Sequence, residues 1–545
     1  MNLKQKIEYY QKNYDVIDVI DLDKWNTLKS FQQDPWLLKT LQDLHRTEYQ
    51  IQQRIVLVMN NTDINDRLLI SLIRLLNQVD ITLCFVVLLT ACNDVETIKQ
   101  YISNNSKDSN SMIVEHFSLG YQYNSTEPVK VNLKDLTAKQ EHLLSESQTF
   151  CMYPWIHLHA YPTGSAYPCC HAEMAYPVGN VRTDTLKEVW NGSAMKQLRI
   201  DMLTETPNSA CTRCYEQENS GFFSGRRSAN KHHGHHINRV AETQDDGTVE
   251  QFEMTYWDIR FSNLCNLKCR SCGHIFSSQW YQDQAKLAGG VWKERNTVLN
   301  YAGRTETDMW NQLVPHLDYV EQIYFAGGEP LLMEEHYRIL DELVRRKRFD
   351  VRLIYNTNFT HTDLKGQSVF EYWKQFDSVA VGASLDASGA RGEYIRKGTD
   401  WAVVEQNRRE MIEICPGVDF YISPTLSIMN ALHLPDFHRD WVEKGLIRAQ
   451  DLNVNILQDP PHYRIDIAPA EYKAQLESVY RTHLEWLSVQ DPLHRATVGF
   501  ESAITYMNAT DNTHLLDTFW RKTHELDSIR NEHILDIIPE LKALK

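Results

Sequence analysis

The sequence predicts an α/β protein built around a partial (β/α)6 barrel. Between residues 251 and 460, six short apolar runs of strand type alternate with segments whose apolar residues recur at helical spacing. This alternation is typical of parallel strands joined by helices. Six units are too few for the common eight-stranded closure, so we expect an open barrel. An N-terminal α/β domain (1–145), a cysteine-rich module (148–220), a linker (221–250) and a helical C-terminal extension (461–545) complete the predicted organisation.

The composition is that of a globular protein. The chain has 545 residues, of which 42% are hydrophobic and 23% charged, and we expect about three domains. A net charge of −16 disfavours non-specific binding to nucleic acid or anionic membrane. No apolar run approaches the roughly 18 residues of a membrane span, and no apolar segment follows the N-terminus as in a secretory signal. We therefore expect a cytoplasmic protein, in which eleven cysteines favour metal or redox chemistry over disulfides.

Residues 1–145 predict a small parallel α/β layer. Buried strands are expected at 54–59 and 81–89, with helical spacing at 65–76 and 95–102. The residues that follow the first strand, 59–63, contain no glycine, so a dinucleotide or P-loop site is unsupported. Docking, substrate recognition and a purely structural cap all remain open for this segment.

Residues 148–220 carry five of the cysteines. The alternating residues after Cys151 predict a hairpin that turns at 162–165 and leads to Cys169 and Cys170. Helices are expected at 185–190, where Thr185 and Glu188 form a capping box, and at 193–203. Cys211 and Cys214 close the module. If one of Cys169 and Cys170 is used, four thiolates are available, which is the full complement for an iron–sulfur cluster. A structural zinc site with four thiolates is the alternative.

Residues 221–250 predict a linker. Its run from Lys231 to His236 holds four histidines, which can bind metal, although we favour a solvated loop. Arg226, Arg227 and Lys231 are candidates for contact with an acidic group of a substrate.

Polar residues stand where the predicted barrel strands end. The strands are expected at 253–261, 320–325, 351–355, 378–385, 419–425 and 451–457. Active sites of parallel barrels are built at the C-terminal ends of the strands. After the second, third and fourth strands the sequence places the candidates Gly327, Gly328, Glu329, Pro330, Asn356, Asn358, Ser384 and Asp386. The two glycines allow close backbone approach, Glu329 can pair with an ammonium, and Arg396 can bind a carboxylate as a fork.

The first barrel strand leads into Cys265, Cys269 and Cys272, a C-x3-C-x2-C motif. Three thiolates can hold three corners of a [4Fe–4S] cluster and leave one iron open to an outside ligand, as a catalytic zinc keeps an open position. A zinc knuckle completed by His274 or by a remote residue is the alternative.

This motif resembles the signature of the radical S-adenosylmethionine (SAM) superfamily. The residues around it match as well: 260–264 (Arg-Phe-Ser-Asn-Leu) precede it, and 327–330 (Gly-Gly-Glu-Pro) follow. The resemblance covers more than half of the chain and is closest to members with a twitch or SPASM extension, which carry an auxiliary iron–sulfur cluster. Two features depart. Ser271 stands where many members have an aromatic residue, and the cysteine-rich module precedes the barrel, whereas in familiar members it follows.

The resemblance implies a reaction. A [4Fe–4S] cluster on Cys265, Cys269 and Cys272 reduces SAM, bound at the open iron, and the resulting 5′-deoxyadenosyl radical takes a hydrogen atom from the substrate. The loop 327–330 is implied to contact the SAM amino group. Asn358, Ser384 and Asp386 resemble the positions that contact its ribose and methionine parts, and Arg396 could bind its carboxylate. Asn356 is a further cofactor-binding candidate.

The resemblance also implies further cofactors and partners. An auxiliary cluster, of [4Fe–4S] type, falls to Cys151, one of Cys169 and Cys170, Cys211 and Cys214. The electron donor is a protein such as flavodoxin or ferredoxin. The expected substrate is a peptide, which would be oxidised, cross-linked or epimerised. Two alternatives stay open: dehydrogenation of a small molecule such as an amino sugar, and a zinc-stabilised binding protein without catalysis.

Residues 461–545 predict helices at 469–486 and 515–538, separated by a polar break at 507–512. No catalytic constellation is visible there, so packing is the expected role.

Overall fold

The computed structural model describes residues 136–545 except 220–223, 306 and 492–493, together with four earlier strands. The chain divides into two units. The first comprises Met1–Ser125, Arg448–Gln450 and Tyr480–Glu501, and the second comprises the remaining residues. In the first unit, β1 (Val16–Asp21), β2 (Arg54–Met59), β3 (Cys84–Leu89) and β4 (Met112–His116) form a parallel sheet in the order β1-β2-β3-β4. The two strands predicted in this region are thus present, and the helices predicted there lie outside the described residues.

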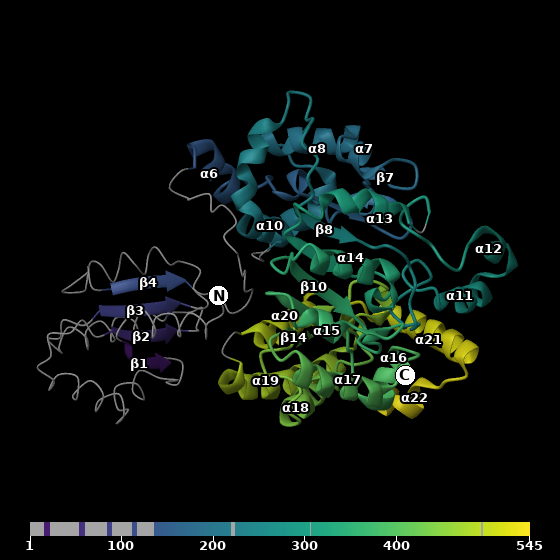
Figure 1. Ribbon diagram of the computed structural model, residues 1–545. Coiled ribbons are helices and arrows are strands. Elements are labelled where there is room, and N and C mark those ends of the chain that lie inside the picture. The colour runs from purple at the N-terminus through teal and green to yellow at the C-terminus, as the bar shows by residue number, and fades with distance from the viewer. Residues whose placement is uncertain are drawn as a thin grey trace, which may run out of the picture. The chain divides into compact units, whose positions relative to one another are not determined.

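The second unit is organised around an eight-stranded mixed sheet of order β14-β13-β10-β9-β8-β5-β6-β7 (Figure 1). Its parallel part consists of β8 (Tyr256–Ile259), β9 (Gln322–Phe325), β10 (Arg352–Thr357), β13 (Val379–Ala383) and β14 (Asp419–Ile422). The register places Leu353 opposite Ile323 on one side and Val379 on the other. Each of these five strands overlaps one of the first five predicted barrel strands, and β10 extends two residues beyond the predicted 351–355.

The sixth predicted strand, 451–457, is present only in pieces. Leu452 bridges to Ile422 at the end of β14. The short strand β16 (Asn455–Ile456) then pairs in parallel with β15 (Thr425–Leu426), which continues the chain after β14.

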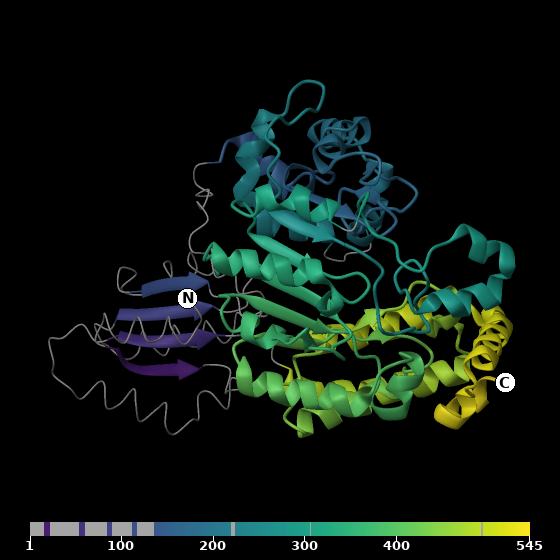
Figure 2. The same ribbon diagram turned by 45° about the vertical axis from the view of Figure 1, so that its right-hand side comes forward.

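The cysteine-rich module extends this same sheet. Its strand β5 (His157–Ala160) pairs in parallel with β8, and β6 (Ser165–Tyr167) and β7 (Gly179–Asn180) follow in antiparallel order. The predicted turn at 162–165 is present, and Gly164 adopts the left-handed φ of +87° that it requires. The sequence left open which side of the barrel strands the module covers. In the structure the module joins the sheet at the β8 edge. Its helices α7 (Leu186–Trp190) and α8 (Ser193–Leu203) lie at the end of the sheet opposite β14 (Figures 1 and 2).

Helices between the parallel strands bury the sheet. They are α14 (Glu334–Arg345), α15 (Val369–Trp373), α16 (Gly389–Ile395), α17 (Trp401–Ile414) and α18 (Leu434–Glu443). All five residues of β13 are buried, and Tyr355, Phe370 and Trp373 are fully enclosed in the core. Parallel strands covered by helices on both faces are expected to be this apolar.

Residues 224–242 are not the solvated loop that we favoured. They form α10 (Gly225–His233) and the 3-10 segment η6 (Gly234–Glu242). Arg226 is buried, pairs with Glu218 and donates hydrogen bonds to the carbonyls of Ser147 and Phe150. Arg226 is therefore engaged by the protein itself and is not available to a substrate, contrary to the sequence prediction. Arg227 and Lys231 lie at the surface.

The C-terminal region is helical, as predicted. It contains α19 (Ala470–Gln490), α20 (Arg495–Ala509), α21 (Leu516–Arg530), α22 (Ile534–Ile537) and η12 (Pro539–Leu544). The single helix expected at 515–538 is divided because Asn531 caps α21 in the left-handed conformation, with φ of +54°. In the part of the chain that the structure describes, no helix is both long enough and apolar enough to cross a membrane.

A buried histidine in α14 gives the fold a predicted acid sensitivity. His336 is fully buried and shares a 2.9 Å hydrogen bond between its Nε2 and the hydroxyl of Tyr355, and burial lowers its pKa to about 3. In the unfolded chain this histidine has the usual pKa of 6.5. Below pH 6.5 the unfolded state therefore binds a proton that folded His336 does not bind, so the free energy of unfolding decreases as the pH falls. Between pH 7 and pH 5 we expect wild-type protein to lose about 2 kcal/mol more unfolding free energy than a His336→Gln variant. Urea unfolding at both pH values measures this, and equal losses in the two proteins would contradict it.

Candidate functional site

The three cysteines after β8 lie close together and are largely buried. Cys265 and Cys269 are 8% and 9% exposed, and Cys272 packs against them. Burial raises the pKa of all three thiols, that of Cys272 to about 12, and each of Cys265 and Cys272 is raised further by the neighbouring Cys269. Buried thiols of this kind ionise when a metal replaces their protons, since metal binding and thiol deprotonation are coupled. The donors therefore suit a metal centre.

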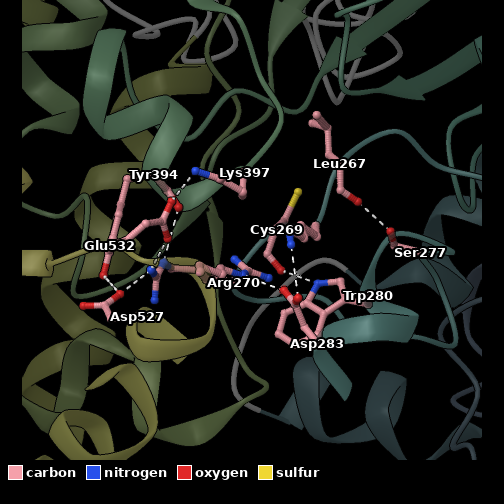
Figure 3. A network of polar contacts seen from close by, with 12 residues as sticks. Leu267, Cys269, Arg270, Ser277, Trp280, Asp283, Tyr394, Lys397, Asp527 and Glu532 are labelled. Carbon is pink, nitrogen blue, oxygen red and sulfur yellow. Dashed lines mark hydrogen bonds and ion pairs between the residues drawn. The ribbon is translucent and has the colours of Figure 1, made fainter. Parts of the chain in front are cut away.

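The backbone around these cysteines is held by hydrogen bonds from other segments. Lys268 N–H donates to the Lys397 carbonyl at 2.9 Å, and Arg270 N–H donates to the Ile395 carbonyl at 2.8 Å. Trp280 Nε1 donates to the Cys269 carbonyl at 2.8 Å, and the Ser277 hydroxyl donates to the Leu267 carbonyl (Figure 3). The loop is thus fixed through its main chain.

The spacing of the sulfur atoms distinguishes a cluster from a single ion. Among the described residues, no three cysteine Sγ atoms lie within 4.8 Å of one another. A tetrahedral zinc with Zn–S bonds of about 2.3 Å needs sulfur atoms about 4 Å apart. A polynuclear iron–sulfur cluster is wider and is held by more widely spaced thiolates. The residues present therefore fit a cluster better than a single zinc ion, at both cysteine sites.

Side chains from the next strand ends reach the cysteine loop. After β10, Asn358 Nδ2 lies 4.0 Å from Cys265 Sγ and donates to Asn266 Oδ1 at 2.8 Å. Arg396, at the end of α16, lies 3.7 Å from Cys269 Sγ through Nη1. Its Nε and Nη2 hold Asp386 at 2.8 and 2.9 Å. The structure thus places Asn358 and Arg396 beside the cysteines, with Asp386 holding Arg396.

The glycine pair packs against the cysteine loop. Gly327 and Gly328 have φ of +80° and +52°, and a Cβ on Gly328 would lie 2.3 Å from the Leu264 carbonyl oxygen. Glu329 N–H donates to that same carbonyl at 2.7 Å. The close approach that we predicted from the glycines therefore serves contact with the protein's own backbone just before Cys265. Pro330 follows as the first residue of η8 (Pro330–Leu332).

Glu329 braces the end of β10. Its carboxylate is 1% exposed and accepts hydrogen bonds from the Thr357 hydroxyl and the Asn358 N–H, both at 2.7 Å, and from the Leu331 N–H. Burial raises the pKa of Glu329 to about 7. Both oxygens accept hydrogen bonds from the chain, so the carboxylate holds the loop after β9 against the end of β10.

Two further candidates lie on neighbouring strands. Asn356 is half-buried in β10, with its Oδ1 at 2.9 Å from the position that a Cβ on Gly382 would take. Ser384 N–H donates to the Thr357 carbonyl at 2.7 Å, just after β13.

The module's cysteines form a second group. Burial raises the pKa of Cys169, and the proximity of Cys170, Cys151, Cys211 and Cys214 raises it further. Cys151 is affected in the same way by Cys211 and Cys214. They come from segments far apart in sequence: Cys151 precedes η4 (Tyr153–Trp155), Cys169 follows β6, Cys211 ends η5 (Ser209–Cys211) and Cys214 lies in α9 (Thr212–Asn219).

Cys170 points elsewhere. Burial raises its pKa to about 12, and the next contribution comes from Asp258 on β8, to which its side chain is hydrogen-bonded. The other module thiols thus raise the pKa of Cys169, whereas Asp258 makes the next contribution for Cys170, and this difference favours Cys169 as the fourth ligand.

The N-terminus of α10 also touches this second group. The sulfur of Cys214 accepts hydrogen bonds from the backbone N–H groups of Arg226 and Gly225, which lower its pKa against the larger effect of burial. Sequence reasoning missed this contact because it assigned these residues to a linker. The signal was Ser224, an N-cap whose side chain accepts from Arg227 N–H.

A buried polar cluster lies on β5 and β8. His159 Nδ1 is 2.9 Å from Asp258 Oδ2, and both side chains are fully buried. Arg260 Nε donates to Asp258 Oδ1 at 2.7 Å. Burial alone would raise the pKa of Asp258, but Arg260 and His159 hold it well below its usual range. Sequence reasoning missed this cluster, although Tyr256, Asp258 and Arg260 alternate along the strand.

The C-terminal helix α21 is tied to the cysteine loop, which the sequence did not predict (Figure 3). Arg270 is 1% exposed, pairs with Asp527 and with Glu532 at 2.7 Å, and lies 3.7 Å from the centroid of the Tyr394 ring. Glu532 also holds Lys397 at 2.8 Å. A second link joins Arg530 of α21 to Asp283 of α11 (Trp280–Ala288), also at 2.8 Å.

We expect Asp527→Ala to destabilise the second unit by about 3 kcal/mol, because breaking a buried ion pair leaves the Arg270 charge poorly compensated. The change also removes an acceptor from the Tyr394 hydroxyl and the Ile534 N–H. Glu525→Ala on the same helix is the matched control, because its pair with Lys522 is more than 40% exposed on both sides and is worth under about 1 kcal/mol. Urea unfolding and the rate of iron loss from cluster-loaded protein measure the difference. Similar behaviour of the two variants would contradict a supporting role for α21.

Comparisons with known proteins bear on these two groups. Residues 151–215 match the family model of the SPASM domain, described as an iron–sulfur cluster-binding domain. No curated protein is detectably similar in sequence to this chain.

Among solved structures, the chain is similar to two with bound S-adenosylmethionine (AdoMet) and to one with another ligand. For anSMEcpe with bound AdoMet the identity is 22%, the match covers 41% of this chain and 59% of that chain, and the TM-score is 0.29. For SuiB of Streptococcus suis bound to S-adenosylmethionine, the identity is 12%, the match covers 54% of this chain and 62% of that chain, and the TM-score is 0.27. For TYW1 with a lysine–pyruvate adduct bound, the identity is 13%, the match covers 41% of this chain and 70% of that chain, and the TM-score is 0.22.

The chain spans less than two thirds of the length of anSMEcpe and SuiB. The SPASM match includes Cys151, Cys169, Cys170, Cys211 and Cys214 and thus covers every cysteine of the second group. The chain therefore contains a SPASM iron–sulfur cluster-binding domain, and this match supports the resemblance to SPASM-containing radical SAM proteins that its cysteine motifs indicate.

Proposed function

We propose that this chain is a radical SAM enzyme with one cluster on Cys265, Cys269 and Cys272 and an auxiliary cluster in the SPASM domain. We also propose that the parallel strands from β8 to β14, with β15 and β16, form a partial (β/α)6 barrel with the first cluster at its mouth. The N-terminal sheet and the C-terminal helices are accessory parts in this proposal.

One observation carries the proposal. The loops after β9 and β10 contact the three-cysteine loop through Glu329 N–H to Leu264 and Asn358 to Cys265. Arg396, at the end of α16, contacts Cys269 and is held by Asp386 from the loop after β13. Single hydrogen bonds of this kind are common in any fold. Their convergence on one loop that offers three buried thiols suits a catalytic cluster with an open position.

The protein's own residues bind and orient the cluster and SAM, and they shield the site from water. Cys265, Cys269 and Cys272 would hold a [4Fe–4S] cluster, and bound SAM would supply a 5′-deoxyadenosyl radical that takes a hydrogen atom from the substrate. Arg396 offers a cation next to Cys269, held in place by Asp386, where a carboxylate of SAM can be bound. Asn358 offers an amide beside Cys265. The backbone of 327–330 is proposed to meet the SAM amino group, with Asn356 and Ser384 further along the strand ends.

The proposed auxiliary ligands are Cys151, Cys169, Cys211 and Cys214. Their mutual proximity, and the hydrogen bonds from Gly225 and Arg226 to Cys214, support this set. Four protein thiolates would complete the coordination, so this cluster would transfer electrons rather than bind SAM.

We propose a peptide as the substrate, because SPASM extensions in the resembled family often serve peptide modification. Two solved structures of anSMEcpe hold a bound peptide together with AdoMet. Dehydrogenation of a small molecule is the second candidate. A flavodoxin or ferredoxin is the proposed electron donor, and the cytoplasm is the proposed location.

Anaerobic incubation with SAM, dithionite and candidate peptides, followed by mass spectrometry, tests the proposal. We expect methionine and 5′-deoxyadenosine to form without peptide at a low rate and faster with the right one. Loss of two hydrogens from the peptide indicates dehydrogenation or cross-linking, and gain of one solvent deuterium indicates epimerisation. Protein that binds zinc, contains no acid-labile sulfide and leaves SAM intact would overturn the proposal.

A further inference from the structure

We propose that His235, His236 and Glu321 form a divalent-metal site that is separate from both cysteine groups. Among the described residues, these three alone form a group of at least three histidine, cysteine or carboxylate side chains whose ligand atoms all lie within 4.8 Å of one another. The site goes beyond the radical chemistry proposed above and does not depend on it.

The two imidazoles converge on one carboxylate oxygen. His235 Nε2 lies 2.9 Å and His236 Nε2 lies 3.1 Å from Glu321 Oε2. In a tetrahedral site with bonds of about 2.0–2.1 Å, ligand atoms lie about 3.3–3.4 Å apart. Each imidazole nitrogen therefore needs to move away from the carboxylate oxygen by only a few tenths of an ångström to admit an ion.

The donor set suits a borderline transition metal. Two imidazole nitrogens and one carboxylate are ligands of Zn²⁺ and of similar first-row ions, with water completing the coordination. In the metal-free protein each Nε2–H can donate to Glu321, so metal binding moves each imidazole proton to Nδ1. The side chains are 11–27% exposed, which leaves access from solvent.

The site lies at the end of the sheet away from the catalytic loops. Glu321 immediately precedes β9, where its N–H donates to the Thr255 carbonyl at 2.8 Å and its carbonyl accepts from Arg352 N–H at 2.9 Å. The loop 327–330 follows the opposite end of the same strand. Residues at the N-terminal ends of barrel strands usually serve stability.

A metal here would anchor η6 to the base of the sheet. The chain segment formed by α10 and η6 begins at Gly225 and Arg226, which contact Cys214. An ion held by His235, His236 and Glu321 would therefore fix the segment that closes the SPASM cysteine group. We infer a structural role, in which metal binding raises the thermal stability of the second unit.

Cobalt(II) titration of the full chain, with both iron–sulfur clusters already loaded under anaerobic conditions, tests this site. We expect one cobalt per chain beyond the clusters, visible d–d bands, and no thiolate-to-cobalt charge-transfer band, since all three ligands are nitrogen or oxygen. Zinc should displace the cobalt and raise the unfolding temperature. Bands with sulfur character, or binding of no cobalt, would overturn the proposal.

Two variants separate a metal site from a plain hydrogen-bond network. Glu321→Gln should weaken cobalt binding at least tenfold, because even an outer contact to a metal site is typically worth about 10–100-fold. Glu253→Gln is the matched control, since Glu253 holds the same segment through an ordinary 3.0 Å pair with Arg239. It should bind cobalt as the wild type does. If Glu321→Gln and Glu253→Gln both bind cobalt with wild-type affinity, the three residues form only a hydrogen-bond network.

Discussion

Replacing Cys265, Cys269 and Cys272 together by alanine should abolish SAM cleavage and leave one cluster in the protein. These three thiols are the buried sulfur donors of the loop after β8, which the main chain holds through Lys268, Arg270 and the carbonyl of Cys269. Without them the loop offers no thiolate to iron, while the SPASM cysteines are untouched. Iron and sulfide content should fall by about half, since each [4Fe–4S] cluster carries the same number of atoms.

Anaerobic reconstitution followed by iron analysis, and chromatography for 5′-deoxyadenosine, measure both expectations. Cys415→Ala is the matched control, because Cys415 is 3% exposed and follows α17, away from both cysteine motifs in sequence. It should retain both clusters and SAM cleavage. If the triple variant keeps two clusters, the ligands of the first cluster lie elsewhere. If it keeps one cluster and still cleaves SAM, the reaction belongs to the SPASM group.

The parallel strands of the second unit were predictable from the sequence because their signal is local. Buried parallel strands are continuous apolar runs bounded by polar loops, and each of the first five predicted runs overlaps an observed strand. The helix at 193–203 and the capping box of Thr185 and Glu188 were predicted for the same reason, since helix caps and periodicity are written within a few residues.

Contacts between distant segments were not predictable in this way. The pairing of β5 with β8 joins residues about a hundred positions apart, as in His157 with Tyr256. Arg270 finds Asp527 at a separation of 257 residues, although it reads as an ordinary charge between two cysteines. The histidine run was visible, but the carboxylate that gathers two of its rings, Glu321, lies 85 residues further on. In each case the contact joins residues far apart in the sequence, and the spacing of apolar residues along the chain does not show which residues will meet.

The choice between Cys169 and Cys170 shows the same limit most sharply. Cys169 and Cys170 are adjacent in the turn that follows β6, so the sequence allows two ligand sets. The structure separates them, with Cys169 next to Cys151, Cys211 and Cys214 and Cys170 hydrogen-bonded to Asp258. We therefore expect Cys169→Ser to lose the auxiliary cluster and Cys170→Ser to retain it.

The two serine variants test this directly, because they make the same chemical change one residue apart. A serine at position 169 removes one of four thiolates from the SPASM group, so iron content should fall by about half while the cluster of Cys265, Cys269 and Cys272 and some SAM cleavage remain. A serine at position 170 can still donate a hydrogen bond to Asp258, so iron content should match that of wild type. Metal binding contributes to folding free energy, so Cys169→Ser should also lower the unfolding temperature more than Cys170→Ser. Loss of the cluster in Cys170→Ser with retention in Cys169→Ser would reverse the assignment. Retention in both would mean that either sulfur can complete the site.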